Sequence, residues 1–157
     1  MGKLEPDGPF CSAMRDLIAD RFDTLWKKIP AAVTGEDIEG VHDVRVASRR
    51  LRAAMDVAVD CFPAEWYRPL HKEAKGITRA LGSVRDLDVQ IEALAFQRLN
   101  SPPEEWPGID RLLHRLERER DDKRDQMLKF LEEIEARDVA NEVADRFGRQ
   151  ASDEDAS

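Results

Sequence analysis

Cysteine is scarce in this 157-residue chain, which holds only Cys11 and Cys61. The two have neither the short spacing of a metal or redox motif nor a secretory context, so we expect ordinary reduced thiols and no disulfide. The N-terminus lacks the apolar core of a signal peptide, and no uncharged stretch approaches the roughly 18 residues of a membrane-spanning helix. These absences predict a cytoplasmic protein with no membrane partner.

Aromatic residues and net positive charge are also in short supply. Aromatics make up 6% of the chain, and 25 Lys and Arg face 33 Asp and Glu, which leaves a net charge of -8. Net acidity argues against a general nucleic-acid binder, whose footprint is normally basic. The supply of Leu, Ile, Val and Ala is still sufficient to bury a core, so wholesale disorder is not expected. The length allows one compact domain, or one domain with a tail.

The spacing of the apolar residues predicts an all-α protein. They recur at intervals of three and four between short breaks of Pro, Gly and polar residues, and no strand-like alternation persists. We expect helices over residues 12–29, 37–62, 65–81, 83–99, 109–136 and 139–147. The first four of these fall within residues 1–100, and the last two form a C-terminal part over residues 109–148.

Pro, Gly and Ser set the expected helix ends. Pro30 and Pro63 follow the first two helices, and Gly82 offers a left-handed residue after the third. Ser83 would then cap the fourth helix, with Asp86 near its positive end. The Pro-rich stretch 101–108 is expected to be a connector, and the acidic stretch 149–157 a disordered tail.

Positive charge is concentrated in residues 41–85, which hold nine Lys and Arg against five Asp and Glu. Two expected helices each place a row of cationic or imidazole side chains on one face. The rows are His42, Arg45, Arg49 and Arg52 on the second helix, and Arg68, Lys72, Lys75 and Arg79 on the third. A charged helix face is most often solvated surface, but few acids intersperse here. Like charges at these spacings repel by a few tenths of a kcal/mol per pair, so their repetition indicates an anionic ligand.

Two motifs in this basic region resemble those of the CHAD family, the conserved histidine α-helical domain. They read His42-Asp-Val-Arg-Val-Ala-Ser-Arg-Arg-Leu-Arg52 and Lys75-Gly-Ile-Thr-Arg-Ala-Leu-Gly-Ser-Val-Arg-Asp-Leu-Asp-Val89. The resemblance implies an antiparallel helical bundle whose basic residues line a groove or pore for inorganic polyphosphate. It also implies association with polyphosphate granules.

The resemblance carries polyphosphate-binding roles only to matching residues. The first motif supplies His42, Arg45, Arg49, Arg50 and Arg52, and the second supplies Lys75, Arg79 and Arg85. Arg68 and Lys72 lie outside the motifs and are added from helical geometry alone. Asp43, Asp86 and Asp88 also match, but a carboxylate would repel a polyanion, so we expect them to orient arginines or cap helices.

The family's usual domain contains two pseudo-symmetric helical halves, whereas this chain carries one motif set. Residues 1–100 resemble the N-terminal half, and nothing after Trp106 repeats the histidine–arginine element. We therefore expect two copies to pair around a two-fold axis and rebuild a two-sided basic site. A fragment of a longer protein would show the same pattern.

The resulting hypothesis is a non-enzymatic polyphosphate-binding module without metal or cofactor, with Arg45, Arg49, Lys75 and Arg79 as primary contacts. One alternative is an enzyme acting on phosphate chains or diphosphates, because Asp121, Asp122 and Asp125 have the D-D-x-x-D spacing that holds magnesium on helical prenyl synthases. In so charged a segment this spacing arises easily. Nucleic-acid binding is a second alternative, poorly supported because Trp66 falls on an apolar helix face. A third is a helical adaptor that binds partners through residues 109–136.

Overall fold

The computed structural model describes residues 5, 8–36 and 39–148. These residues form five α-helices and no strand, which confirms the all-α class. The helices are α1 (Pro9–Thr34), α2 (Glu39–Val57), α3 (Ala64–Leu99), α4 (Trp106–Ala136) and α5 (Val139–Phe147), with 3-10 turns η1 (Val59–Cys61) and η2 (Pro103–Glu105). The acidic stretch 149–157 lies outside the described residues.

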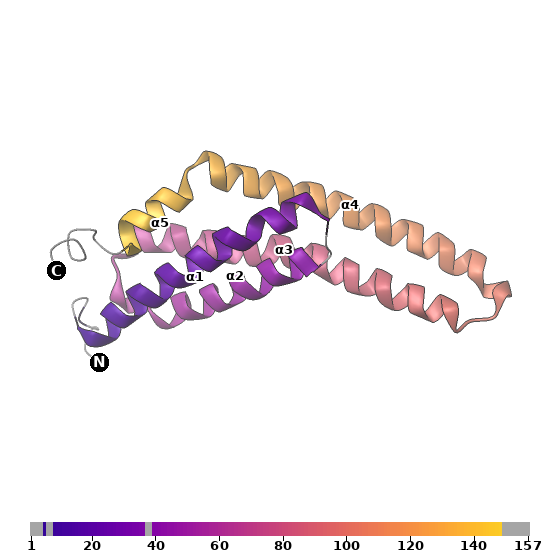
Figure 1. The fold of residues 1–157 in the computed structure, drawn as a ribbon, viewed down its shortest axis with the longest axis horizontal. Helices are drawn as coiled ribbons and strands as arrows, with labels where there is room; N and C mark the ends of the chain where they lie inside the picture. Colours follow the sequence, from indigo (N-terminus) through magenta and orange to yellow (C-terminus); the bar gives the residue numbers. More distant parts are fainter. Residues whose placement is uncertain (1–4, 6–7, 37–38, 149–157) are drawn as a thin grey trace.

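The first four helices form an up-and-down bundle in which α1 packs on α2, α2 on α3 and α3 on α4 (Figure 1). The short helix α5 folds back and contacts both α1 and α4. Because α3 has 36 residues and α4 has 31, they run past α2, which has 19, as a two-helix hairpin (Figure 1). None of the described helices is long and apolar enough to cross a bilayer.

The core is built from the apolar stripes that the sequence predicts. Ile18 and Leu25 of α1, Leu51 of α2 and Ile77 of α3 are fully buried, as is Met127 of α4. Each such side chain contributes about 1.5–3 kcal/mol by leaving water. At one end of the bundle, Phe147 of α5 packs against four rings, those of Phe22, Phe62, Trp66 and Tyr67.

The third and fourth predicted helices are a single helix, so the prediction of a break at Gly82 is wrong. The described part of residues 1–100 accordingly contains three α-helices and not four. The Ser83 hydroxyl caps no new helix but donates to the carbonyl oxygen of Arg79 at 3.1 Å. Glycine inside a helix costs about 0.5–1 kcal/mol. Complete burial of Leu81 and Val84 on either side offsets that cost and keeps α3 continuous.

The two helix ends that we predicted from Pro30 and Pro63 are also wrong. α1 does not stop before Pro30 but contains it and ends at Thr34, where Gly35 takes the left-handed conformation with φ 69°. α2 ends at Val57, before η1, and not at residue 62; its expected start at residue 37 lies outside the described residues. α4 begins at Trp106 inside the expected connector, while α5 has its predicted bounds.

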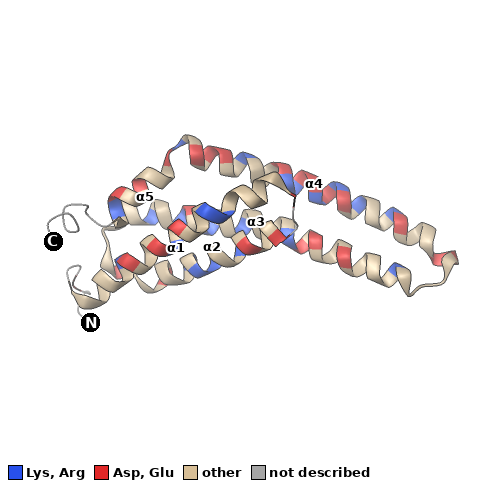
Figure 2. Ribbon diagram, viewed as in Figure 1, with Lys and Arg blue, Asp and Glu red and all other residues tan. Residues whose placement is uncertain are grey.

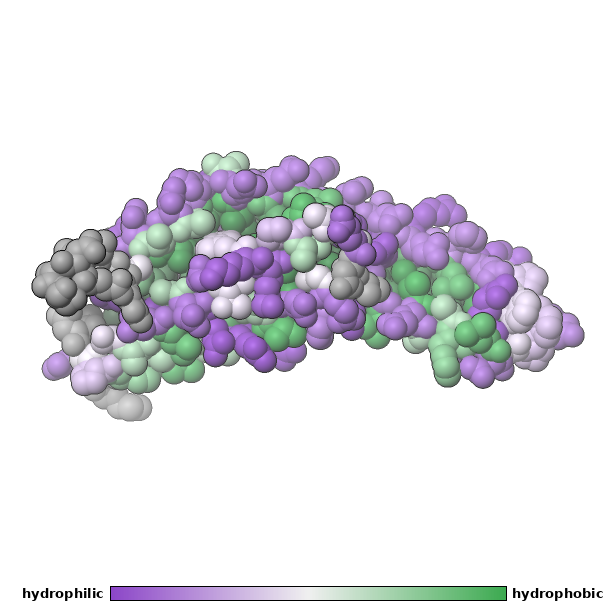
Figure 3. Space-filling model, in the orientation of Figure 1, coloured by the Kyte–Doolittle hydropathy of each residue, from purple (hydrophilic) through white to green (hydrophobic). Residues whose placement is uncertain are grey.

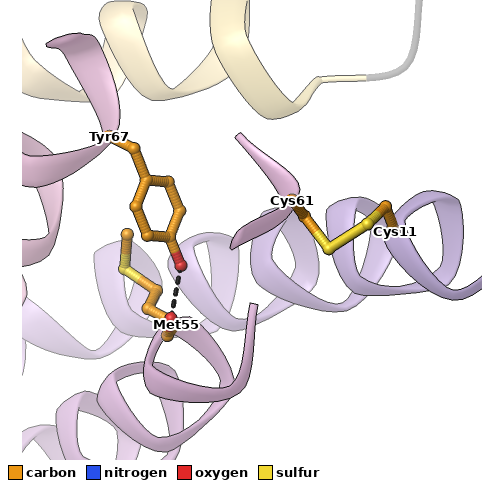
Figure 4. Close-up of a disulfide and its surroundings, with 4 residues drawn as sticks. All are labelled: Cys11, Met55, Cys61 and Tyr67. Atoms are coloured by element: carbon orange, nitrogen blue, oxygen red, sulfur yellow. Dashed lines mark hydrogen bonds between the residues drawn. A yellow bond between two sulfur atoms is a disulfide. The ribbon is translucent and has the colours of Figure 1, made fainter. Parts of the chain in front are cut away.

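The expectation of free thiols is also wrong, because Cys11 and Cys61 form a disulfide (Figure 4). The two residues lie 50 positions apart in sequence, but their Cα atoms are 5.4 Å apart. The start of α1 and the turn η1 meet at the same end of the bundle, and both cysteines are buried there. Sequence spacing carries no information about this meeting, which depends on how α1 and α2 fold back on each other.

Candidate anion-binding site

Both cationic rows lie on helices whose mutual register is fixed by polar contacts between α2 and α3. The hydroxyl of Thr78 donates to the hydroxyl of Ser48 at 3.1 Å, deep between the two helices. Nearer the C-terminal end of α2, His71 Nε2 lies 2.6 Å from a carboxylate oxygen of Asp56. We refer to the line of these contacts as the α2–α3 seam.

Three side-chain nitrogen atoms near the start of α2 are buried without a hydrogen-bond partner among the described residues. They are Nδ1 of His42, Nε of Arg45 and Nη1 of Arg85. Arg45 reaches across the seam, since a methyl group added to Gly82 would lie 3.6 Å from its Nε. Nη1 of Arg85 is 3.9 Å from a carboxylate oxygen of Glu39, which is an ion pair and too long for a hydrogen bond. An unpaired buried donor costs about 1–3 kcal/mol, which the oxygen of a bound anion would recover.

The row on α3 lines a cavity of about 730 Å³ between α3 and α4. We call this cavity the α3–α4 groove; its cationic lining residues are Arg68, Lys72, Lys75, Arg79 and Arg137. Phe130 and Gly76 also line it, and a Cβ on Gly76 would meet the Phe130 ring at 2.5 Å, so glycine lets the two helices approach here. Glu73, also in this lining, is paired with Arg137, which leaves the four α3 cations without a described carboxylate partner.

Part of the α2 row faces another cavity, of about 270 Å³, between α1 and α2. In this α1–α2 groove, His42 and Arg50 of α2 meet Arg21 and Lys28 of α1. Asp43 lies at the same place as the one carboxylate in the lining. The groove therefore combines four basic or imidazole side chains from two helices that are distant in sequence.

The structure thus places eight of the ten predicted site residues in the two grooves or at the α2–α3 seam. Arg49 and Arg52 are exposed on α2 and line neither groove, while Arg45 and Arg85 lie at the α2–α3 seam. Figure 2 shows Lys and Arg together with some Asp and Glu along α2 and α3, and both signs of charge along α4. Arg21, Lys28 and Arg137 were missed by sequence reasoning because only the packing of α1 and α4 brings them to the motif residues.

The three motif aspartates differ in their surroundings. Asp88 is buried and accepts a hydrogen bond from Nε of Arg120 on α4 at 2.9 Å. Asp88 therefore orients an arginine, as the sequence led us to expect, although that arginine lies on α4 and outside the motifs. Asp43 and Asp86 are exposed.

Two sets of side chains bear on metal binding. Glu39, His42 and Asp43 each bring one ligand atom within 4.8 Å of the other two, a group that sequence reasoning did not single out. The guanidinium of Arg85 sits beside Glu39, and Arg50 lines the groove beside Asp43, so positive charge is already supplied there. Asp121, Asp122 and Asp125 are exposed on α4 and form no comparable group among the described residues.

At the end of the α2–α3 seam that lies away from the start of α2, the buried Tyr67 makes an uncharged contact between the two helices. The Tyr67 hydroxyl donates to the carbonyl oxygen of Met55 at 2.6 Å (Figure 4). Burial, and next the negative charge of Asp56, raise the pKa of this hydroxyl above its ordinary value. Tyr67 is thus a neutral donor that holds α2 against α3.

Comparison with known proteins agrees with the arrangement of motifs and helices. A family model described as the CHAD domain matches residues 16–157, which is nearly the whole chain and includes α4 and α5. No curated protein and no solved structure matches. With the two basic motifs on adjacent helices of an all-α bundle, the chain belongs to the CHAD family.

Proposed function

We propose that this protein binds inorganic polyphosphate without chemically altering it, through the cationic side chains of the α2–α3 seam and its two flanking grooves. The main observation behind this proposal is that His42, Arg45 and Arg85 each have a buried side-chain nitrogen without a hydrogen-bond partner among the described residues. Membership of the CHAD family, which is associated with polyphosphate, supports the same ligand.

The chemistry of the grooves suits a flexible chain with about one negative charge per phosphate. Arginine can grip two phosphate oxygens through its planar fork, whereas lysine acts as a mobile point charge. The α3–α4 groove offers both types on one helix face, from Arg68 to Arg79. Aromatic rings for base stacking are few beside these cations, because Trp66 packs against Phe62 and Phe147. This composition favours a bare phosphate chain over a nucleic acid.

Charge reversal tests the proposal. The variant Arg45→Glu/Arg49→Glu/Lys75→Glu/Arg79→Glu should lose retention on immobilised polyphosphate and keep its helical circular dichroism. A matched control reverses four exposed cations on α4, in Arg111→Glu/Arg115→Glu/Arg118→Glu/Lys129→Glu, and should keep most of the binding. Equal loss in both variants would show that only net charge matters. Unchanged binding in the first variant would refute the assignment.

The same sample distinguishes binding from turnover and from nucleic-acid recognition. We expect no phosphate release from polyphosphate in the presence of magnesium, and competition by polyphosphate against single-stranded RNA at fixed ionic strength. Affinity should fall steeply with added salt, because each neutralised phosphate releases a counterion. Measured phosphate release would favour the enzymatic alternative.

We further propose that two copies pair to complete a two-sided basic site. The face of α3 that α2 covers continues beyond the start of α2 as Val89, Phe96 and Leu99. These apolar side chains are 46%, 68% and 75% exposed, so a second copy has something to bury. Sedimentation analysis with and without polyphosphate tests this, and a monomer under both conditions would contradict it.

A further inference from the structure

A cleft of opposite character lies between α1 and α4, on a different part of the bundle from the basic grooves. Its volume is about 550 Å³, within the range of small-molecule sites. Most of its lining is apolar: Trp26, Ile29, Pro30, Val33, Leu128, Leu131, Ile134 and Ala140. In Figure 3 apolar surface shows between α4 and α1, framed by the hydrophilic outer face of α4.

Arg124 lies at one end of the cleft and α5 at the other. At one end Arg124 of α4 donates to the carbonyl oxygens of Ala32 and Val33 at the end of α1, at 3.1 and 2.8 Å. At the other end α5 contacts both α1 and α4 (Figure 1). A cleft of this volume fits a compact molecule better than a long helix or an extended peptide.

Charge at the cleft is negative. Glu132, Glu135 and Asp138 line it, and the described lining includes no Lys, Arg or His. The indole of Trp26 is partly exposed, so it can offer ring surface to a cation, and it also stacks on Phe22 in the core. The segment 149–157 is a poor occupant, because it carries three carboxylates and no apolar residue larger than alanine.

We propose that this cleft binds a small hydrophobic cation, such as an aromatic or alicyclic amine or a quaternary ammonium ion. The apolar walls would take the hydrocarbon body, and the three carboxylates together with the Trp26 ring would favour positive over negative charge. This site is independent of polyphosphate binding, since it shares no lining residue with either basic groove.

Two ions of the same shape and opposite charge give a direct test. Tetraphenylphosphonium and tetraphenylborate differ in charge sign, so their comparison separates electrostatic selection from hydrophobic binding. Each is titrated into the full chain, with calorimetry for affinity and the nuclear magnetic resonance signals of the Trp26 indole and the Leu128 and Leu131 methyl groups for location. We expect the cation to shift these signals and to bind at least about tenfold more tightly at this site than the anion.

The variant Glu132→Gln/Glu135→Gln should weaken binding of the cation about tenfold and should not weaken binding of the anion, which loses two repulsive charges. A matched control, Glu119→Gln/Asp122→Asn, changes the charge of the same helix equally at exposed positions outside the cleft and should have little effect. Equal binding of the two ions at the cleft, absence of cation binding, or an unchanged affinity in the Glu132/Glu135 variant would each overturn the proposal. So would cleft signals that move with protein concentration alone, since a second copy would then cover the cleft.

Discussion

The hydroxyl of Tyr67 on α3 donates a hydrogen bond to the backbone carbonyl oxygen of Met55 on α2, at 2.6 Å. Tyr67 is 1% exposed and is the only tyrosine in the chain. The substitution Tyr67→Phe leaves that buried carbonyl without this donor, so we expect a loss of about 1–2 kcal/mol in the free energy of unfolding. Urea denaturation followed by circular dichroism measures it, and a variant as stable as the parent would contradict the role of the bond.

The same residue gives the stability a pH dependence at alkaline pH. Burial raises the pKa of Tyr67 in the folded state above its ordinary value of 10.0. Above pH 10 the unfolded chain therefore releases a proton that the folded chain keeps, so stability falls as pH rises, by up to about 1.4 kcal/mol per pH unit. Tyr67→Phe should lack this part of the slope. Tyrosinate absorbance should appear together with unfolding, and ionisation of a folded chain near pH 10 would contradict this.

The disulfide should be a large contributor to stability. A closed loop of this size is expected to add about 3–4 kcal/mol by restricting the unfolded chain. Cys11→Ala/Cys61→Ala, or reduction of the parent protein, should lower the unfolding temperature. Thiol titration of the unreduced, denatured protein is the check, and two reactive thiols there would show that the bond does not form.

Gly40 lets α2 approach the backbone of α1 closely. A Cβ added there would lie 2.7 Å from the carbonyl oxygen of Ala31, and backbone atoms cannot move aside as a flexible side chain can. Gly40→Ala should cost about 1–3 kcal/mol in unfolding free energy. Gly108→Ala is the control, because its Cβ would have no neighbour closer than 3.9 Å; this change in α4 should be neutral or slightly stabilising. Equal effects of the two substitutions would refute the packing argument.

The buried pair of Asp88 and Arg120 should behave as a coupled unit. Asp88 is 3% exposed, and removing its partner in Arg120→Met leaves a buried carboxylate uncompensated, at a cost of about 3–5 kcal/mol. The double variant Asp88→Leu/Arg120→Met should be more stable than that single variant. A double-mutant cycle in urea measures the coupling, and simple additivity of the two single changes would show that the pair does not interact.

The exposed apolar residues Val89, Phe96 and Leu99, on the part of α3 that extends beyond α2, provide a test of whether two copies pair. If two copies bury them, Phe96→Glu/Leu99→Glu should shift sedimentation toward the monomer. Gln90→Glu/Gln97→Glu adds the same charge at exposed positions of the same helix and should leave the dimer intact. Dissociation in both variants would point to charge repulsion and not to loss of the apolar contact.

The helical class and much of the core could be read from the sequence because apolar spacing reports directly on which side of a helix is buried. Leu51 and Ile77 belong to this apolar spacing, and both are fully buried. Helix ends were less predictable because local punctuation competes with tertiary packing. Gly82 and Pro30 are usual breakers, but α3 and α1 continue through them where both flanking turns bury apolar residues.

Part of the candidate site could likewise be predicted from the sequence, and part could not. Helical spacing grouped the cations of α3, and the structure places Arg68, Lys72, Lys75 and Arg79 in one groove. Helical spacing could not identify Arg21 or Lys28 as site residues, because they lie near His42 only when α1 packs on α2. The pairing of Cys11 with Cys61 escaped for the same reason, since contact between segments so far apart in the chain has no local signature.

That sulfur link makes residues 11–61 a covalent ring enclosing nearly all of α1 and the whole of α2. A protease that cuts the backbone once inside this ring releases no fragment, because both products stay attached through Cys11 and Cys61. Such a nicked molecule would migrate as intact protein on a denaturing gel until a reducing agent is added. Digestion of this half is therefore visible only after reduction, whereas a cut in the α3–α4 hairpin separates two pieces at once.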